Sequence, residues 1–524
     1  MMRSAVATAS RALRPTRAPR PLNSLWIRPT ATARLRSFSS TVSQRQEERK
    51  WSTPLAKQLF EAISLTGPVP LASYMRMCLT GDLGGYYTGA IGEGRDQFGT
   101  KGDFVTSPEI SQIFGELIGI WFIAEWISQG RPKSGVQLIE VGPGRGTLMD
   151  DMLRTIQRFP DMANSIDAVY MVEASRELQD TQKNLLCGPD AQSTESNIGH
   201  QSTSSKYENK PIIWTDSIKS IPIEPSKIPF IVAHEFFDAL PIHTFQSAEA
   251  KPPPSTPGAS PTAAADAGEA NEAPSQGPKP PAMEWREMMV SPTPPGTTHA
   301  QLGTPKSEQH EPVPEFQLIL SSTPTRHSRY LPESSPRYRR LKQSPGSVIE
   351  VCPDASIYAT DFATRIGGSP KHPKPQPSGA ALILDYGTSD TIPINSLRGI
   401  RHHKRVNPFS APGLVDLSVD VDFTAIADIA TGASEGVEVH GPIGQGDFLE
   451  LMGIRERAQM LAKAPGVTKE TAENIDRSWK RLVDRGPGGM GKVYKALAIL
   501  PENEGRRRPV GFGGDVREKT SSQA

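Results

Sequence analysis

The 524-residue chain has little cysteine and no long apolar run. Its three cysteines, Cys78, Cys187 and Cys352, are too far apart to form a C-x-x-C pair, so their spacing supports neither a zinc site nor a disulfide framework. A membrane-spanning helix needs about 20 consecutive apolar residues. The best candidate, 117–127, is short and is interrupted by Glu125. We therefore expect a buried amphipathic helix there, no transmembrane segment and no metal.

Acidic residues are also missing from the first 46 positions, where arginine is frequent. Glu47 is the first acid, and eight arginines lie within 1–38, among many Ser, Thr and Ala residues. Arg-rich, Ser-rich and acid-free segments are typical of mitochondrial transit peptides, and Arg36-Ser37-Phe38-Ser39 resembles a matrix-protease cleavage site. We predict a transit peptide at 1–38 and a location in the mitochondrial matrix. The alternative is a generic basic disordered tail.

The remaining chain has no excess of positive charge. Lys and Arg together number 58 and Asp and Glu 57; without the eight arginines of 1–38, 50 basic residues face 57 acidic ones, a net charge of −7. A nucleic-acid-binding surface would require a basic footprint, so we expect no nucleic-acid partner. Nothing in the sequence indicates the oligomeric state.

Proline and glycine are abundant, at 49 and 45 residues, and they cluster. Residues 248–315 are dense in Pro, Ala, Ser and Gly, a composition that cannot bury enough apolar surface to fold. We interpret 248–315 as a low-complexity insertion in a surface loop. Within it, 283–290 has the pattern of a strand that could pair with 316–320. We expect shorter insertions at 189–206 and 367–378, and a disordered tail at 501–524.

The rest of the chain alternates short apolar runs with segments of helical periodicity. Alternating strands and helices predict a parallel sheet covered on both faces. We therefore predict an α/β fold with a doubly wound, mostly parallel sheet, an N-terminal helical or lid region at 50–130, and a core in two parts, 131–247 and 316–500. The expected strands are 136–141, 168–172, 212–214, 230–233, 380–385 and 493–500, and the expected helices include 51–79, 147–158 and 177–186.

The strongest local motif is a glycine turn between the first expected core strand and its helix. Gly142, Gly144 and Gly146 follow Glu140 directly after an apolar run. Glycine permits the turn and lets a ligand approach the backbone closely. The G-x-G-x-G spacing departs from the G-x-G-x-x-G of dinucleotide folds. Glu140 is placed to accept a bond from a ligand ammonium, although structural glycine turns of this kind are frequent.

Acidic residues also end the next two strands. Glu173 follows the strand at 168–172, where a carboxylate can take both hydroxyls of a ribose; it could instead cap the next helix. Asp216 follows 212–214 and could meet an adenine amino group, or be an ordinary loop acid. Together with the glycine turn, these acids match a site for S-adenosylmethionine (SAM) better than one for NAD.

A fourth strand end carries the candidate catalytic residues, His234, Glu235 and Asp238. Paired carboxylates suit a guanidinium group, whose five donors form a rigid fork. We predict that Glu235 and Asp238 clamp such a group, since methyl transfer depends mainly on orientation. Asp238 could instead cap a turn. His234 could act as a base or be a structural histidine.

Several long motifs resemble the MidA family of mitochondrial complex I assembly methyltransferases. They are G-D-F-V-T-S-P-E-I-S at 102–111, the glycine turn, H-E-F-F-D-A-L-P at 234–241, L-I-L-D-Y-G at 382–387, the segment 398–423 with His403-Lys404, Pro412-Gly413 and Asp416-Leu417, and G-P-I-G-Q-G at 441–446. The resemblance covers about 50–500 without the insertions. In one departure, many members have Asn where this chain has His234.

The resemblance implies a class I SAM-dependent methyltransferase that symmetrically dimethylates an arginine of a complex I core subunit. It also implies that Gly102, Thr106, Ser107 and Glu109 belong to a segment that closes over the cofactor. Tyr86 and Tyr87 are then candidate lid aromatics, or residues that only pack. Two other functions stay open at this stage: a non-catalytic complex I assembly chaperone that retains a SAM-binding fold, and an NAD-dependent oxidoreductase, against which the glycine spacing argues.

Overall fold

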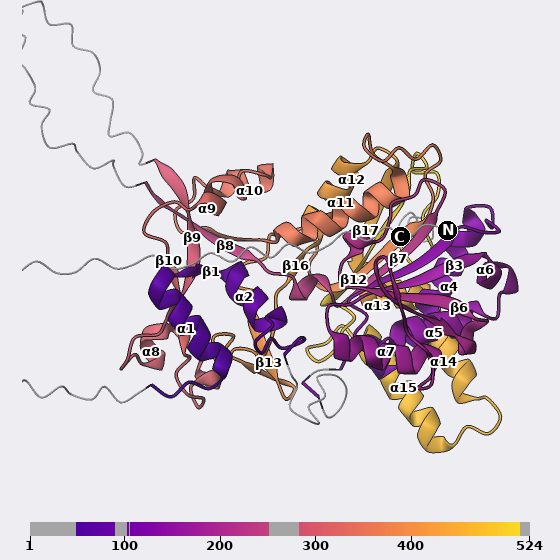
Figure 1. Cartoon of the computed structure of the whole chain (residues 1–524), viewed down its shortest axis with the longest axis horizontal. Coiled ribbons are helices and arrows are strands. Elements are labelled where there is room, and N and C mark those ends of the chain that lie inside the picture. The colour runs from indigo at the N-terminus through magenta and orange to yellow at the C-terminus, as the bar shows by residue number, and fades with distance from the viewer. Residues whose placement is uncertain (1–48, 90–101, 104, 251–281, 514–524) are drawn as a thin grey trace, which may run out of the picture. The chain divides into compact units, whose positions relative to one another are not determined.

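The computed structural model describes residues 49–89, 102–103, 105–250 and 282–513 (Figure 1). Trp51–Ala524 forms a unit distinct from Met1–Lys50. The predicted transit peptide at 1–38, the Pro-rich residues 251–281 and residues 514–524 lie outside the described part of the chain.

The main sheet of the described chain has ten strands, and its centre is parallel. The order is β17-β18-β12-β7-β2-β3-β6-β5-β4, with β16 also paired to β12. The bonds from β12 through β7, β2 and β3 to β6 are parallel, whereas β18, β17, β5 and β4 pair antiparallel. The strands are β2 (Val136–Val141), β3 (Ile166–Val172), β4 (Thr194–Ser196), β5 (Gly199–Ser204), β6 (Lys210–Thr215), β7 (Ile228–His234), β12 (Ala380–Thr388), β16 (Val421–Asp422), β17 (Val437–Gly444) and β18 (Tyr494–Pro501).

Alternate side chains of the central strands enter two separate apolar cores. In β2, Leu138 joins one core and Ile139 the other, and Phe230 and Ile231 of β7 divide in the same way. The strands are buried on both faces, as expected of a parallel sheet between helices. Figure 1 shows α11 (Pro353–Gly367) and α12 (Phe423–Ala433) on one side, and α5 (Thr147–Ile156), α7 (Arg176–Cys187), α14 (Ile454–Ala462) and α15 (Lys469–Val483) on the other. The predicted doubly wound fold is confirmed.

Helix α4 (Gln112–Ser128) contains the apolar run 117–127 and is buried in the first core. Its sequence is apolar on nearly every side, so it is a core helix rather than the one-sided amphipathic kind. Within the described residues, helices are too short or too polar to span a bilayer.

The C-terminal segment covers α4, which corrects the expected disordered tail for residues 502–513. Trp121 donates its Nε1–H to the carbonyl of Val510 at 3.0 Å. Arg507 makes two bonds to the fully buried Glu125, at 3.2 and 2.5 Å, and Phe512 joins the first core. These anchors are spaced along a polar stretch, which explains why the composition did not reveal them.

A second group of elements packs around a third apolar core. The expected helix 51–79 is two helices, α1 (Pro54–Thr66) and α2 (Leu71–Thr80), separated by Gly67 and the two-residue strand β1 (Val69–Pro70). They pack on a smaller sheet of β8 (His243–Glu249), β9 (Met283–Pro292), β10 (Phe316–Leu320) and β11 (Val348–Val351). The expected pairing of 283–290 with 316–320 is present, with Leu318 opposite Val290. A third sheet contains β13 (Arg398–Arg401), β14 (Lys404–Val406) and β15 (Asp416–Ser418).

The described parts of the expected insertions are structured. In 282–315, β9 is followed by the short helix α8 (His299–Leu302), which starts with a capping box at Thr298. Residues 189–206 contain the β4–β5 hairpin, which extends the main sheet. In 367–378, the buried Lys374 ammonium donates to the carbonyls of Lys227, Arg365 and Ser378. Hydrogen bonds from the backbone and from polar side chains therefore order segments that contribute little apolar surface.

The contact between the C-terminal segment and α4 predicts an unequal effect of two neighbouring substitutions. Arg507→Ala leaves the buried Glu125 carboxylate without this partner, which costs about 3–5 kcal/mol of unfolding free energy. Arg506→Ala removes only an exposed pair with Glu504 and should change it by less than about 0.5 kcal/mol. Urea unfolding of both variants measures the difference, and equal stabilities would show that 502–513 does not hold α4.

Candidate functional site

A cavity of about 350 Å³ lies at the carboxyl ends of the parallel strands, the position at which open α/β sheets bind ligands. It joins the glycine turn to the segment after β7. Of the residues predicted from the sequence, it is lined by Thr106, Glu109, Glu140, Gly142, Gly144, Glu173, Asp216, His234, Glu235 and Asp238. Gly102, Ser107 and Gly146 lie outside this lining.

The turn after β2 requires glycine at three positions. Gly142, Gly144 and Gly146 have φ of 66°, 53° and 83°, a left-handed conformation that side chains disfavour. A Cβ on Gly142 would lie 2.6 Å from a ring carbon of Phe236. Gly146 is the N-cap of α5. It therefore shapes the turn without touching the cavity, while Gly142 and Gly144 leave the backbone open to a ligand.

Glu140 presents a buried carboxylate at the end of β2. The residue is 2 % exposed, and its Oε2 has no hydrogen-bond partner within the described residues. Burial, with a smaller contribution from the nearby Glu173, raises the pKa of Glu140 well above its usual value. An ammonium group in the cavity would donate a hydrogen bond to Oε2 of Glu140 and would compensate the negative charge of the carboxylate.

Glu173 and Asp216 occupy different environments at the ends of the next two strands. Glu173 accepts the Ser175 N–H at 2.8 Å and the Gln182 amide at 3.4 Å, and burial raises its pKa to about 7. It therefore braces the start of α7, as the capping alternative expected, and also lines the cavity. The Asp216 side chain is 64 % exposed and accepts the Gln179 amide at 3.2 Å, at the solvent edge of the site.

Glu235 follows β7 in a strained conformation and is buried. Its φ is +48°, which is uncommon outside glycine and clusters at functional sites. One carboxylate oxygen lies 3.3 Å from Nε2 of His234 and 3.4 Å from the Ser107 N–H. Burial, followed by the charge of Asp238, raises the pKa of Glu235 well above its usual value. Burial lowers the pKa of His234 to about 3, so that ring is neutral.

Asp385 and Tyr386, at the end of β12, fix the segment that carries Asp238. One Asp385 oxygen accepts the backbone N–H groups of residues 236, 237 and 238 at 3.1, 2.9 and 3.3 Å. The Tyr386 hydroxyl donates to Asp238, and the Arg398 guanidinium lies 4.4 Å from the Tyr386 ring centre. Asp238 is therefore a buried, oriented carboxylate. Burial raises its pKa despite the hydroxyl bond and the nearby arginine.

The structure adds a third carboxylate to this end of the cavity, Asp416 of β15. It lines the cavity with Glu235 and Asp238, accepts the Tyr87 hydroxyl at 3.0 Å, and has a pKa raised to about 7 by burial and by Asp238. Asp416 was not among the site residues predicted from the sequence. The signal that could have found it is Asp416-Leu417, one of the motifs shared with the MidA family.

Residues 105–109 lie beside the glycine turn and the carboxylates. Thr106 and Glu109 form a capping box at α3 (Ser107–Ile110), and Glu109 lies 3.4 Å from Arg145 of the glycine turn. Gly102 precedes Asp103, which accepts the Tyr86 hydroxyl at 2.8 Å. Of the two candidate lid aromatics, Tyr87 lines the cavity, whereas Tyr86 is buried in the third core and contacts the Tyr87 ring edge-on.

One cavity thus combines a glycine cradle for a nucleoside-type ligand with a group of buried carboxylates. The free oxygen of Glu140 and the open backbone at Gly142 fit the amino-acid portion of SAM, whose ammonium is cationic. The opposite end, with Glu235, Asp238 and Asp416, fits a second positively charged group. The two ends are continuous, so groups bound at both would meet inside the protein.

Comparisons with known proteins agree with this geometry. Residues 117–443 match the family described as "Putative S-adenosyl-L-methionine-dependent methyltransferase". The chain is 31% identical over 482 residues to "Protein arginine methyltransferase NDUFAF7, mitochondrial" of Xenopus tropicalis, covering 91% of this chain and 93% of the relative. It is 33% identical to the Homo sapiens protein of the same name over 455 residues, covering 86% and 84%.

The fold also matches a solved structure with a bound cofactor product. A "likely methyl transferase" from Burkholderia thailandensis bound to S-adenosyl-homocysteine superposes with a TM-score of 0.58 at 20% identity, covering 88% of this chain and 93% of that one. At this identity the likeness concerns the fold alone. The family match and the curated relatives together show that the chain belongs to this family of S-adenosyl-L-methionine-dependent methyltransferases.

Proposed function

We propose that the chain is a protein-arginine N-methyltransferase of the mitochondrial matrix that symmetrically dimethylates a complex I subunit and is needed for complex I assembly. The relatives named as mitochondrial protein arginine methyltransferases support the reaction and the compartment. The resemblance to the MidA family supports the complex I target. The observation that carries the proposal is the single cavity that joins the glycine turn to three buried carboxylates.

At the cofactor end, each residue has a distinct task. The Glu140 carboxylate pairs with the ammonium, Glu173 accepts the ribose hydroxyls, and Asp216 reaches the adenine amino group. The backbone at Gly142 and Gly144 lies against the ligand. Thr106 and Glu109 line the cavity beside it, and Gly102 and Ser107 belong to the same stretch of chain outside the lining. Bound there, SAM supplies an electrophilic methyl group on a positively charged sulfur.

At the substrate end, the buried carboxylates select and orient a guanidinium. Burial disfavours the ionised forms of Glu235, Asp238 and Asp416. A positively charged guanidinium that enters the cavity compensates their negative charge and so stabilises these ionised forms. Paired carboxylates fix the plane of the fork. That fixed plane directs one nitrogen toward the cofactor end, which is the orientation methyl transfer requires.

Methylation also releases a proton from the arginine nitrogen. Glu235 is suited to accept it at a carboxylate oxygen, because its surroundings already favour the protonated form. His234 is a weak base, with its pKa held near 3 by burial. We therefore assign His234 to positioning the Glu235 carboxylate, from which it lies 3.3 Å.

Incubation of the mature chain with methyl-labelled SAM and purified complex I subunits tests the activity. Transfer of label to arginine, located by mass spectrometry, supports the proposal, and a dimethyl mark on both terminal nitrogens supports the symmetric product. SAM binding without transfer to any subunit would instead favour a non-catalytic assembly chaperone.

The cofactor assignment predicts that Glu173→Ala abolishes measurable SAM binding while the protein stays folded. The variant loses two charge-assisted bonds to the ribose, which together correspond to at least about 100-fold in affinity. Glu177→Ala is the matched control, because Glu177 is exposed in the first turn of the same helix. Calorimetry with SAM measures both, and wild-type affinity in Glu173→Ala would disprove the ribose role.

The substrate assignment predicts the opposite pattern for Glu235→Ala. SAM affinity should stay within about twofold of wild type, whereas the methylation rate at saturating SAM should fall by at least about 100-fold, because the guanidinium loses a charged hydrogen-bonding partner. Single-turnover assays with labelled SAM measure the rate, and the calorimetric SAM affinity is the internal control. Full activity in this variant would place the guanidinium clamp elsewhere.

A further inference from the structure

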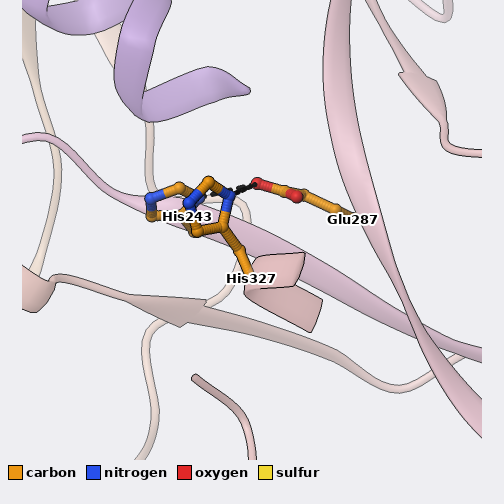
Figure 2. A group of neighbouring side chains, drawn as sticks. All are labelled: His243, Glu287 and His327. Atoms are coloured by element: carbon orange, nitrogen blue, oxygen red, sulfur yellow. Dashed lines mark hydrogen bonds and ion pairs between the residues drawn. The ribbon is translucent and has the colours of Figure 1, made fainter. Parts of the chain in front are cut away.

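Three side chains with metal-ligating atoms meet in the smaller sheet, away from the cavity described above. His243 is the first residue of β8, Glu287 lies in β9, and His327 belongs to the short helix α9 (Arg326–Tyr330). Figure 2 shows the Glu287 carboxylate and the two imidazole rings pointing toward one another from separate parts of the chain. Their potential ligand atoms all lie within 4.8 Å of one another.

The two distances from the Glu287 carboxylate to the imidazoles are close to those of a tetrahedral ion site. Nδ1 of His243 lies 2.7 Å from Oε1 of Glu287, and Nδ1 of His327 lies 3.4 Å from the same oxygen. Ligand atoms about 2.0–2.1 Å from a tetrahedral Zn²⁺ are about 3.3–3.4 Å apart. The His327 contact already has this spacing. The His243 contact would lengthen by about 0.6 Å, a small ring movement, once an ion replaced the proton between them.

The surroundings hold these side chains in place. The Glu287 carboxylate is fully buried, and its second oxygen accepts the Thr325 hydroxyl. The His243 ring is buried and stacks over Phe245, with an interplanar angle of 6°. Carboxylates and histidines that ligate metals are usually oriented by such outer contacts. The His327 side chain is 43% exposed, which leaves an approach from solvent.

We propose that His243, Glu287 and His327 bind one divalent transition-metal ion of the zinc type, with a water molecule as the fourth ligand on the solvent side. Two imidazole nitrogens and one carboxylate oxygen are a ligand set for such ions. On binding, Nδ1 of each imidazole and one Glu287 carboxylate oxygen each donate a lone pair to the ion. His243 then carries its single ring proton on Nε2: a neutral ring moves the proton there from Nδ1, and a charged ring releases the Nδ1 proton to solvent. The bond between the two side chains is replaced by two bonds to the ion.

The position of the proposed ion site indicates a role in stabilising the fold rather than in the reaction. None of the three ligands lines the cavity that contains Glu235 and Asp238. The ion would instead join three elements that lie far apart in the sequence, with the ligands 44 and 40 residues apart. Because these ligands come together only in the folded chain, an ion that binds them raises the stability of the folded form.

Metal stoichiometry tests the proposal independently of methylation. The full mature chain, without an affinity-tag polyhistidine, is stripped with EDTA, equilibrated with Zn²⁺ and freed of unbound ion by gel filtration. We expect one equivalent of retained Zn²⁺, a higher unfolding temperature than the stripped protein, and visible absorption bands of four-coordinate Co²⁺ when Co²⁺ is used instead.

Two variants and one control locate the ion. His327→Ala alters a half-exposed side chain and should fold normally, and Glu287→Gln keeps the shape and can still accept the Thr325 bond. Each should weaken Zn²⁺ binding by at least about tenfold to 100-fold and remove the Co²⁺ bands. His310→Ala, at a 70% exposed histidine, should keep both. Absence of retained Zn²⁺ in the wild type, or full retention in both variants, would overturn the proposal.

Discussion

The site depends on carboxylates that the fold removes from water at the ends of its strands. Glu140 lies near the end of β2, Glu235 follows β7 and Asp385 ends the apolar run of β12, and burial raises the pKa of each. An isolated buried carboxylate costs free energy unless it is neutralised or paired. The buried carboxylates without a compensating positive charge therefore lie where the protein is expected to bind its ligands. The groups that relieve this cost are cations, and both the SAM ammonium and a substrate guanidinium meet that requirement.

The same constraint explains the strained backbone at Glu235. A non-glycine residue in the left-handed region costs about 1–3 kcal/mol and persists only when its neighbours determine it. Asp385 provides that determination by accepting three successive N–H groups just after Glu235, and the Glu235 N–H itself bonds to the carbonyl of Leu384. The buried Asp385 carboxylate thus fixes the backbone that orients Glu235 and Asp238. Asp385 contributes to the site through geometry, although it lies outside the cavity lining.

Local patterns were sufficient for the central sheet and for several of the acids and glycines that line the cavity. The predicted strand 136–141 has the bounds of β2, because both of its faces are buried and the run is flanked by glycine. The acids Glu140 and Glu173 could be selected because each directly follows an apolar run. Helix α11 was missed although Ala359, Phe362, Ala363 and Ile366 have helical spacing and are buried; the signal was present but was not used.

What sequence patterns could not supply depends on contacts between distant positions. Asp416 reaches the cavity from a three-residue strand of another sheet, so no local periodicity marks it. Arg507 and Val510 anchor the C-terminal segment to residues 382 and 389 positions away, in a stretch whose composition is polar. The expectation of no metal rested on cysteine spacing, a criterion that cannot detect two histidines and a glutamate brought together by three separate elements.

The proposed ion site and the substrate end are connected through the backbone rather than through shared ligands. Only four residues separate Asp238 from His243, and Phe237, Ile242 and Phe245 are buried on either side of this short link. A tether at His243 would limit how far the start of β8 can move, and with it the segment held by Asp385. The two ends of the link would then be fixed by different chemistry, hydrogen bonds to Asp385 at one end and the proposed metal coordination at the other. On this view the smaller sheet is a rigid support for the carboxylate that faces the substrate.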